Sequence, residues 1–514
     1  MLVKTFGSAV YGVEAITITI EVNVTGQGTN YYIVGLPDNA VKESVQRVES
    51  AIKSNGFEMP RTKLVVNLAP ADIRKTGTAF DLPIAIGILG ATGQVENPER
   101  LGDYVMMGEL SLDGELRPIK GALPIALQAQ RDGSKGLIIP YQNAKEAAMV
   151  EELPVFAVKH IREVMDFFSD ERSLQPVTVN VKEEFEQAQN HFDVDFADVK
   201  GQENIKRALE IAAAGSHNVI LIGPPGAGKT MLARRLPTIL PPLTLEEALE
   251  TTKIYSVAGK LQEHTTIVCR RPFRSPHHTI SDVALVGGGG NPQPGEISLA
   301  HNGVLFLDEL PEFKRTVLEV MRQPMEERKV TISRARISID LPASFLLVAS
   351  MNPCLCGFFN HPVKECSCPP GSVQKYLGRI SGPLLDRIDL HVEVTPVDVN
   401  ELSSRQSSVK SDDIRKRVIA ARQVQLQRYR QTPGTYANAQ MSSKQLKEIC
   451  LIDPAGQQLL KTAMEKLNLS ARAYDRIIKV SRTIADLSGC ESILPEHLAE
   501  AIQYRSLDRA GWGG

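Results

Sequence analysis

The clearest chemical pattern in the sequence is a glycine-rich loop, GPPGAGKT, at residues 223–230. Apolar residues precede the loop and a helical pattern follows it, so a chance Gly/Pro turn does not explain it. Backbone N–H groups of such a loop surround phosphates at the helix N-terminus, where the helix dipole favours negative charge. Lys229 is expected to reach the β- and γ-phosphates of ATP, and the Thr230 hydroxyl to bind Mg²⁺. The predicted nucleotide contacts are Gly223, Pro224, Pro225, Gly226, Ala227, Gly228, Lys229 and Thr230.

Two further apolar runs are predicted to be strands that end in polar residues suited to the same site. GVLFLDELPEF (303–313) delivers Asp308, a suitable Mg²⁺ ligand, and Glu309, a suitable base for activating water. FLLVASMNP (345–353) ends in Asn352, whose amide could orient the attacking water. An acidic pair after one apolar run is common by itself. Downstream of a phosphate loop, the pair predicts hydrolysis of ATP.

Four of the seven cysteines form a C-x-C-x9-C-x-C pattern, made by Cys354, Cys356, Cys366 and Cys368. Four thiols within fifteen residues indicate a tetrahedral zinc site of structural type. The spacing differs from the usual C-x-x-C pattern, and His361 could replace one ligand. The alternative is a loop of reduced cysteines. The remaining cysteines are isolated and expected in the core: Cys269, Cys450 and Cys490.

A short stretch, VTISRARISID (330–340), predicts a β-hairpin with arginines at its tip. Apolar residues alternate with polar ones on both sides, and the strands are expected to join at residues 333–336, which place Arg334 and Arg336 at the tip. A second irregular stretch, 271–300, holds Arg274, a glycine run and two adjacent histidines, which are expected to build a loop. The arginines could also simply pair with surface acids.

The composition is that of an ordinary globular protein, with 42% hydrophobic and 23% charged residues. A length of 514 residues suggests about three domains. The net charge is −2, so contacts with nucleic acid must come from local basic features. The N-terminus does not resemble a signal peptide, and no apolar run is long enough to span a bilayer. We therefore expect a cytoplasmic protein with reduced cysteines and no membrane contact.

The chain divides into four segments, and the predicted fold class is α/β. Residues 1–168 mix strand-like alternation with helices, and residues 169–195 have the composition of a linker. In residues 196–395, strands alternate with helices as in a parallel sheet, whereas residues 396–514 are helical. Helices that begin near a capping Asp or Ser are predicted over 412–430, 442–449, 453–467 and 470–487.

With these residues in place, the chain resembles the AAA+ ATPases and, more narrowly, the magnesium-chelatase-like ComM/YifB family. The most specific segments are RPFRSPHHTISDVALVGGGGNPQPGEISLAHNGVLFLDELPEF (271–313) and RISGPLLDRIDL (379–390). The resemblance implies a homo-oligomeric ring, expected to be a hexamer, with ATP between subunits. It implies that Arg387 is the arginine finger of a neighbouring subunit and that Arg472 is the second sensor arginine of a helical lid. A surface salt bridge is the alternative for each, and whether Arg472 acts on its own nucleotide or its neighbour's stays open.

The first segment resembles the proteolytic domain of Lon over KTGTAFDLPIAIGILGATGQV (75–95) and GELSLDGELRPIKGALPIALQA (108–129). That domain needs a serine nucleophile and a lysine. Their positions fall on Ala79 and near Pro124, and the nearby Thr78 and Lys120 are out of register. The resemblance therefore implies a Lon-protease-like α+β domain without protease activity, kept for binding or ring assembly.

The family resemblance implies an ATP-driven motor that acts on branched or single-stranded DNA and promotes branch migration in homologous recombination and natural transformation. Insertions at the positions of the hairpin and of residues 271–300 project toward the pore in this clade. Arg334 and Arg336 are then expected to contact DNA, with Arg274 as a weaker candidate. The alternative is a chelatase-type motor that remodels a metal-inserting partner, against which the Lon-like front domain argues. An ATP-dependent protease is opposed by the missing dyad, and a non-enzymatic scaffold by the intact ATP residues.

Overall fold

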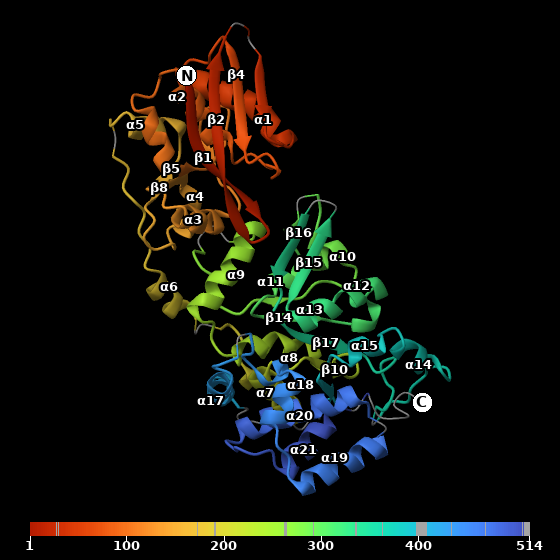
Figure 1. Ribbon diagram of the computed structural model, residues 1–514. Coiled ribbons are helices and arrows are strands. Elements are labelled where there is room, and N and C mark those ends of the chain that lie inside the picture. Colours follow the sequence, from red (N-terminus) through yellow and green to blue (C-terminus); the bar gives the residue numbers. More distant parts are fainter. Residues whose placement is uncertain are drawn as a thin grey trace.

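A computed structural model describes residues 1–505 and 507, except 27, 29, 172, 190–191, 262–264, 291, 335–336, 362, 397–408, 433 and 468. Figure 1 shows an N-terminal domain (red to orange), a central module (mainly green) and a helical C-terminal part (blue). The predicted α/β class with a parallel sheet is confirmed. Within the described residues, no helix combines the length and the hydropathy required to cross a bilayer.

The N-terminal domain is built on a seven-stranded mixed sheet in the order β3-β4-β2-β1-β5-β8-β9. In β2, buried Ile18, Ile20 and Val22 alternate with more exposed polar residues, so one face of the strand packs on α2. All eleven residues of helix α2 are buried, and all of them except Asp81 at its start are apolar. The strands are β1 (Leu2–Tyr11), β2 (Glu14–Thr25), β3 (Tyr31–Val34), β4 (Lys63–Ala69), β5 (Tyr104–Met106), β8 (Gly136–Pro140) and β9 (Val155–Val158), with β6 (Glu109–Leu110) and β7 (Leu116–Arg117) forming a separate small ladder. The helices are α1 (Asn39–Ser54), α2 (Asp81–Ala91), η1 (Pro98–Asp103), α3 (Ala122–Arg131), α4 (Tyr141–Ala147) and α5 (Ile161–Phe168).

The segment expected to be a linker contains a short helix, α6 (Val181–Ala188). Asn180 caps this helix, because its side chain accepts a hydrogen bond from the Glu183 N–H. Val181 and Phe185 are buried in a cluster that includes residues of both the N-terminal domain and the central module. Their i, i+4 spacing is a helical signal, but two apolar positions in a polar segment are too few to indicate a sustained period.

The central module is an α/β unit around a five-stranded sheet in the order β11-β14-β17-β10-β18, in which every neighbouring pair is parallel. Runs such as VILI and VLFL are fully buried because helices cover parallel sheets on both faces. The strands are β11 (Phe273–Arg274), β14 (Val304–Leu307), β17 (Leu346–Met351), β10 (Val219–Ile222) and β18 (Leu390–Glu393). The helices are η2 (Phe196–Asp198), α7 (Glu203–Gly215), α8 (Lys229–Arg235), η3 (Leu236–Thr238), α9 (Leu245–Ala258), α10 (Asp282–Val286), α11 (Glu296–Leu299), η4 (Leu310–Glu312), α12 (Arg315–Val320), α13 (Arg322–Glu327), α14 (Ser372–Leu377) and α15 (Gly382–Leu385). Parallel strands present their carboxyl ends at one edge, and the segments that follow β10, β14 and β17 meet there.

Two small antiparallel ladders accompany this sheet. The predicted hairpin is confirmed as β15 (Lys329–Arg334) and β16 (Ile337–Pro342), with Arg334 opposite Ile337. The stretch 271–300 contains a second ladder, formed by β12 (Gly287–Gly288) and β13 (Gln293–Pro294).

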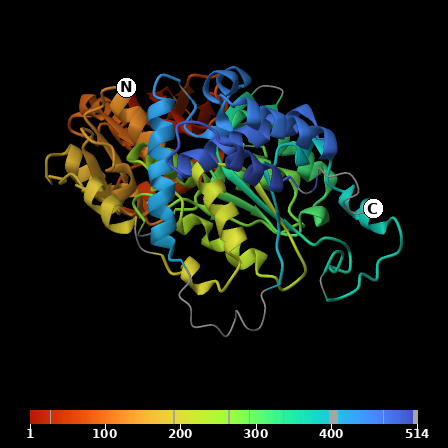
Figure 2. The same cartoon turned by 90° about the horizontal axis from the view of Figure 1, so that it is seen from below.

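The C-terminal part is helical, as predicted. Ser442 and Ser470 cap the helices that follow them through hydrogen bonds from backbone N–H groups. Figure 2 shows these blue helices gathered around one side of the central sheet, and they share a buried cluster with α7 and the sheet strands. The helices are α17 (Ser411–Arg428), η5 (Asn438–Gln440), α18 (Ser443–Ile449), α19 (Pro454–Leu467), α20 (Ala471–Leu487) and α21 (Pro495–Gln503).

Contacts between the N-terminal domain and the central module include one at α9 and one at the hairpin (Figure 1). Helix α3 lies against α9, where the Gly121 N–H donates to the Ser256 carbonyl at 3.2 Å and the Ser256 hydroxyl donates to the Glu146 carboxylate. The β1–β2 turn packs on the hairpin, since a Cβ at Gly12 would lie 2.7 Å from Ile339 Cγ2. The domain therefore touches the middle of strand β16 directly.

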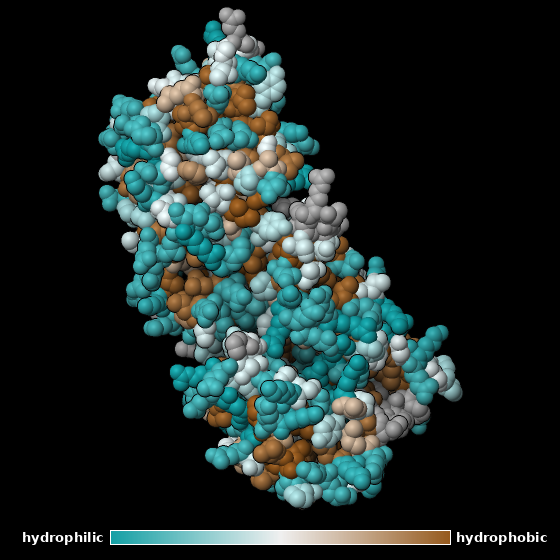
Figure 3. All heavy atoms as spheres, viewed as in Figure 1, coloured by the Kyte–Doolittle hydropathy of each residue, from teal (hydrophilic) through white to brown (hydrophobic). Residues whose placement is uncertain are grey.

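On the face shown in Figure 3, hydrophilic side chains predominate over the central module, whereas apolar side chains gather on the N-terminal domain. Exposed apolar residues of that domain include Tyr32 and Val34 on β3, an edge strand of the sheet.

Candidate active site

The phosphate loop joins β10 to α8, as the sequence predicts. Gly226 and Gly228 have φ angles of +81° and +85°, a left-handed conformation that favours glycine. Gly223 packs closely on the neighbouring strand, because a Cβ there would lie 2.3 Å from the Val394 carbonyl oxygen. These positions explain why the loop is glycine-rich and how its backbone comes to curl in front of the helix.

Lys229 lies inside this loop and is mostly buried. Its ammonium donates to the carbonyls of Gly223 at 2.7 Å and Pro224 at 3.0 Å, and to Asn352 Oδ1 at 3.1 Å. Burial lowers the pKa of the Lys229 ammonium, and the Asp308 carboxylate opposes that shift. Three neutral oxygens thus hold a cation at the point where phosphate oxygens would otherwise accept its hydrogen bonds, and Asn352 is part of the same site.

The hydroxyl and the carboxylate predicted to bind Mg²⁺ are brought together. Thr230 Oγ1 donates to Asp308 Oδ2 at 2.8 Å, and the Ser350 hydroxyl donates to the other carboxylate oxygen. Hydroxyl and carboxylate oxygens are suitable ligands for a hard cation, so Thr230 and Asp308 fit the role of holding Mg²⁺, which stabilises negative charge on phosphates when bound. Ser350 was not predicted. Ser350 is the one polar residue in the otherwise apolar strand β17 (LLVASM). A lone hydroxyl in a buried apolar run is the sequence signal that could have identified it.

Glu309 follows directly and its backbone has a left-handed conformation with a φ of 54°. Its N–H donates to Asp308 Oδ1 at 3.1 Å, so the backbone is held while the side chain remains more than half exposed. His278 Nδ1 lies 3.6 Å from Glu309 Oε2. The ring of His278 is tilted by 34° against that of the adjacent His277, with centroids 4.1 Å apart. The histidines were predicted only to build a loop. The structure shows that this loop reaches the candidate base, because β11 lies beside β14 in the sheet.

Arg387 and Arg472 do not contact the phosphate loop or the paired acids in the described structure. The Arg387 guanidinium pairs with Glu326 at 2.6 Å and donates to the Pro383 carbonyl, and Arg472 pairs with Asp386 at 2.8 Å. The two arginines therefore lie near the same turn, away from the nucleotide site of their own subunit. The role of Arg387 at a neighbour's nucleotide remains a prediction, as does the role of Arg472 at either its own nucleotide or a neighbour's.

The candidate DNA contacts are only partly placed. Arg336 lies outside the described residues, as does the side chain of Arg334, although the strand that leads to Arg334 is described. Arg274 forms a bidentate pair with Glu296, with distances of 2.6 and 2.7 Å. Its charge is matched within the same chain, so a DNA contact at Arg274 would have to compete with that pair.

The parallel sheet, the phosphate loop and the acidic pair beside it fit an AAA+ ATPase, and the family matches identify it as chelatase-like. Residues 195–402 match the family described as magnesium chelatase, subunit ChlI. Residues 20–143 match subunit ChlI of Mg-chelatase, and residues 408–505 match the magnesium chelatase subunit ChlI C-terminal family. ATP and Mg²⁺ are the cofactors that this class implies.

Full-length relatives narrow the class. The chain is 44% identical over 506 residues to the competence protein ComM of Haemophilus influenzae, covering 98% of this chain and 97% of that protein. It is 43% identical over 505 residues to the YifB protein of Salmonella typhimurium, covering 98% and 96%. A partial match to Lon protease 2 of Bacillus subtilis has 36% identity over 184 residues, or 30% of this chain and 32% of that protein. The chain belongs to the ComM/YifB family.

The four clustered cysteines converge in space. Their Sγ atoms all lie within 4.8 Å of one another, and those of Cys354, Cys356 and Cys366 are 3.3 to 3.7 Å apart. Zinc–sulfur bonds of about 2.3 Å in a tetrahedron put sulfurs about 3.8 Å apart, so the donor set fits a structural zinc ion. The cysteine loop packs closely against the phosphate loop. A Cβ at Gly357 would lie only 2.5 Å from Pro225 Cδ. Zinc would thus fix a segment that supports the nucleotide site.

We expect elemental analysis to find about one zinc per chain, because the four thiols provide a complete ligand set. Replacing Cys366 and Cys368 with serine should remove the metal and lower the unfolding temperature. Cys490→Ser is the matched control, since Cys490 lies outside the cluster and should leave the zinc content unchanged. Metal-free wild-type protein with full ATPase activity would contradict the assignment.

Proposed function

We propose that this chain is the subunit of an ATP-driven ring, expected to be a hexamer, that acts on branched or single-stranded DNA. In this proposal the ring promotes branch migration in homologous recombination and natural transformation. The full-length similarity to a protein named for competence carries the proposal, because it coincides with an intact set of ATP residues. The N-terminal domain serves as a Lon-like domain without protease activity, and the C-terminal helices serve as the lid.

The β15–β16 hairpin supports the DNA-directed part of the proposal. It leaves the central module between the acidic pair and Asn352, and its inward side chains Val330, Ile332, Ile339 and Leu341 anchor it in a buried cluster. Because the hairpin is anchored in the core of the central module, a change at the nucleotide site could move its arginines along bound DNA. Contacts to phosphates would let it act on any sequence.

A second candidate is a chelatase-type motor that remodels a metal-inserting partner. The three chelatase family matches favour it, and they weaken one argument against it. The Lon-like resemblance of the front domain argues against this function, yet residues 20–143 themselves match a chelatase family. The presence of the front domain therefore does not separate the two candidates. The two candidates are distinguished by whether DNA stimulates the ATPase activity.

Arg334→Ala combined with Arg336→Ala tests the DNA motor. We expect basal ATPase activity and ring assembly to survive, because neither arginine belongs to the phosphate loop or to the acidic pair. Stimulation of the ATPase by DNA and branch migration of a four-way junction should fall together for every sequence. The slope of log affinity against log salt for duplex DNA should flatten by about 0.9 for each lost phosphate contact.

Lys444→Ala with Lys447→Ala is the matched control, because it removes two exposed positive charges from α18 in the C-terminal part. This control should retain DNA stimulation. Normal branch migration by the hairpin double variant would show that Arg334 and Arg336 are not needed to contact DNA. Absence of any DNA stimulation in the wild-type protein would favour the chelatase-type motor instead.

A further inference from the structure

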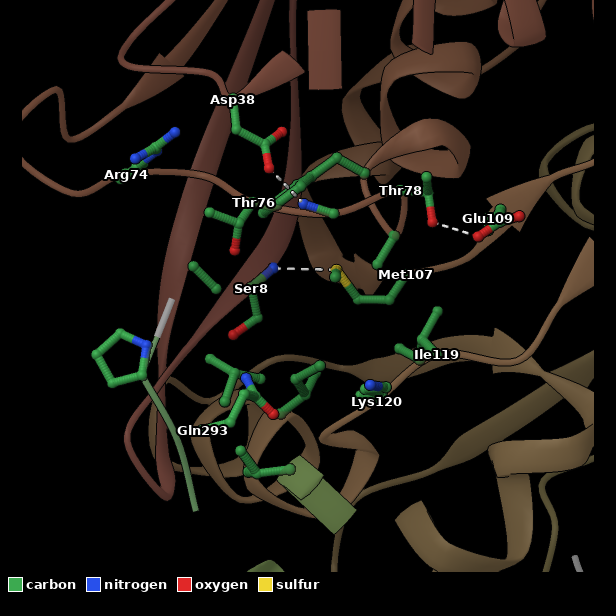
Figure 4. A pocket seen from close by; sticks show the side chains of 18 of the residues that line it. Ser8, Asp38, Arg74, Thr76, Thr78, Met107, Glu109, Ile119, Lys120 and Gln293 are labelled. Carbon is green, nitrogen blue, oxygen red and sulfur yellow. Dashed lines mark hydrogen bonds between the residues drawn. The ribbon is translucent and has the colours of Figure 1, made fainter. Parts of the chain in front are cut away.

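A cavity of about 630 Å³ lies where the N-terminal domain meets the central module (Figure 4). Its volume is within the range of about 300 to 1,000 Å³ found for ligand pockets. The N-terminal domain provides most of the wall, and Gly290, Pro292 and Gln293 of the central module close one side. None of the residues of the phosphate loop or the acidic pair lines it, so the cavity is separate from the ATP site.

The cavity lies at the position where the Lon resemblance places a serine–lysine dyad, and the described lining residues do not form one. Ala79, at the expected serine position, lines it, as do Thr78 and Lys120. The Thr78 hydroxyl donates to the Glu109 carboxylate, as Figure 4 shows, so its proton is directed toward an acid and not toward a lysine base. A cavity with this lining can bind a ligand, but it lacks an activated nucleophile.

One wall of the cavity is an unpaired edge of β1. Strand β2 accompanies β1 along its whole length, but β5 pairs with it only at Phe6 on the other side. The Ser8 N–H points away from β2, toward the sulfur of Met107 at 3.1 Å, which is a weak acceptor. Val10, two residues further, presents its backbone to the same side, where no described strand lies next to it. An edge of this kind can add one extended segment by backbone hydrogen bonds.

The charged residues around this edge indicate which kind of ligand the cavity would bind. Asp38 and Glu109 are both engaged within the chain: Asp38 caps α1 and accepts from the Gly77 N–H, and Glu109 pairs with Arg117 at 3.6 Å. Arg74 and Lys120 are exposed, and neither forms an ion pair or a side-chain hydrogen bond with the described residues. The stem of Lys120 packs over Gly259 at the end of α9, so its ammonium is held at the cavity. Glu109 is neutralised by Arg117, and Asp38 keeps a negative charge that offsets only one of the two cations. The lining therefore has an excess of positive charge, which favours an anionic ligand.

We infer that this cavity binds an extended acidic peptide segment of a partner protein, which adds as a strand along the free edge of β1 and places carboxylates on Arg74 and Lys120. Apolar side chains on the opposite face of the segment would contact the apolar part of the lining, such as Val10, Ile125 and Val257. Since the partner segment touches both the N-terminal domain and the 271–300 stretch, it would bridge the two.

Fluorescence anisotropy with the full-length protein and three labelled nine-residue peptides tests this inference. The first peptide alternates valine and glutamate, the second alternates valine and lysine, and the third repeats the first with alternate backbone nitrogens methylated. We expect only the first to bind, because the second reverses the charge and the third cannot complete a strand ladder. A photoreactive group on the first peptide should label residues 8–12.

Arg74→Glu with Lys120→Glu should weaken binding of the first peptide by about tenfold or more. Lys42→Glu with Arg61→Glu makes the same charge change at exposed positions of the same domain that do not line the cavity, and should leave affinity unchanged. ATPase activity measured alongside should be normal in both, which confirms folding. The inference is overturned if the valine–glutamate peptide does not bind at millimolar concentration, if the lysine or methylated peptide binds equally well, or if the cavity variant keeps full affinity.

Discussion

Glu309→Gln is expected to bind ATP with unchanged affinity and to hydrolyse it about 10² to 10⁴ times more slowly. The Glu309 backbone is fixed by its hydrogen bond to Asp308, and glutamine has the same shape, so the local structure should persist. Thr230 and Asp308 remain in place to hold Mg²⁺, whereas the water loses the carboxylate that would take its proton. Steady-state hydrolysis together with titration of a fluorescent ATP analogue measures the two effects separately.

Glu312→Gln is the matched control for this experiment. Glu312 lies three residues beyond Glu309, at the end of η4, and pairs with Arg379 at 2.8 Å on the surface. The same chemical change at this position should leave turnover within about twofold of the wild-type rate, since a surface ion pair contributes little. Normal hydrolysis by Glu309→Gln would show that another group activates the water.

The second large effect is expected for Arg387→Ala, which should reduce turnover by about 10³-fold or more if Arg387 reaches a neighbour's γ-phosphate. In the isolated chain its guanidinium pairs with Glu326, which is more than half exposed, so the variant should still fold. Its Nε atom is buried without a hydrogen-bond partner among the described residues, which is a further sign that the resting contacts do not satisfy this side chain. Circular dichroism and nucleotide binding check that the fold and the site survive.

Mixing subunits distinguishes a finger that acts on a neighbour from one that acts within its own chain. A subunit with Arg387→Ala retains Glu309, and a subunit with Glu309→Gln retains Arg387. Where the two meet in one ring, a complete site can form and some activity should return. Arg379→Ala, another surface arginine of the same segment, should be active without mixing. Mixed rings that assemble but recover no activity would contradict the proposed exchange between subunits.

The sequence by itself determined which residues make up the candidate nucleotide site. Lys229, Thr230, Asp308 and Asn352 each follow or begin an element whose type is encoded locally, by a buried apolar run or a glycine loop. Because parallel strands end at one edge, knowing the strands was enough to predict that these residues meet. The hairpin and the serine-capped helices were predictable for the same reason, since alternation and capping depend on near neighbours in the chain.

Only the tertiary structure decided how other side chains are used. Ser350 reaches Asp308, His278 reaches Glu309, and Arg274 is matched by Glu296, although nothing in local periodicity announces these pairs. The four cysteine sulfurs converge and their loop touches Pro225 because of how the chain returns after β17. The free edge of β1 exists because β5 is short, and its surrounding charges come from separate loops of one domain. Such contacts depend on which distant segments pack together, and that is fixed by the burial of shared cores and not by the pattern of any one segment.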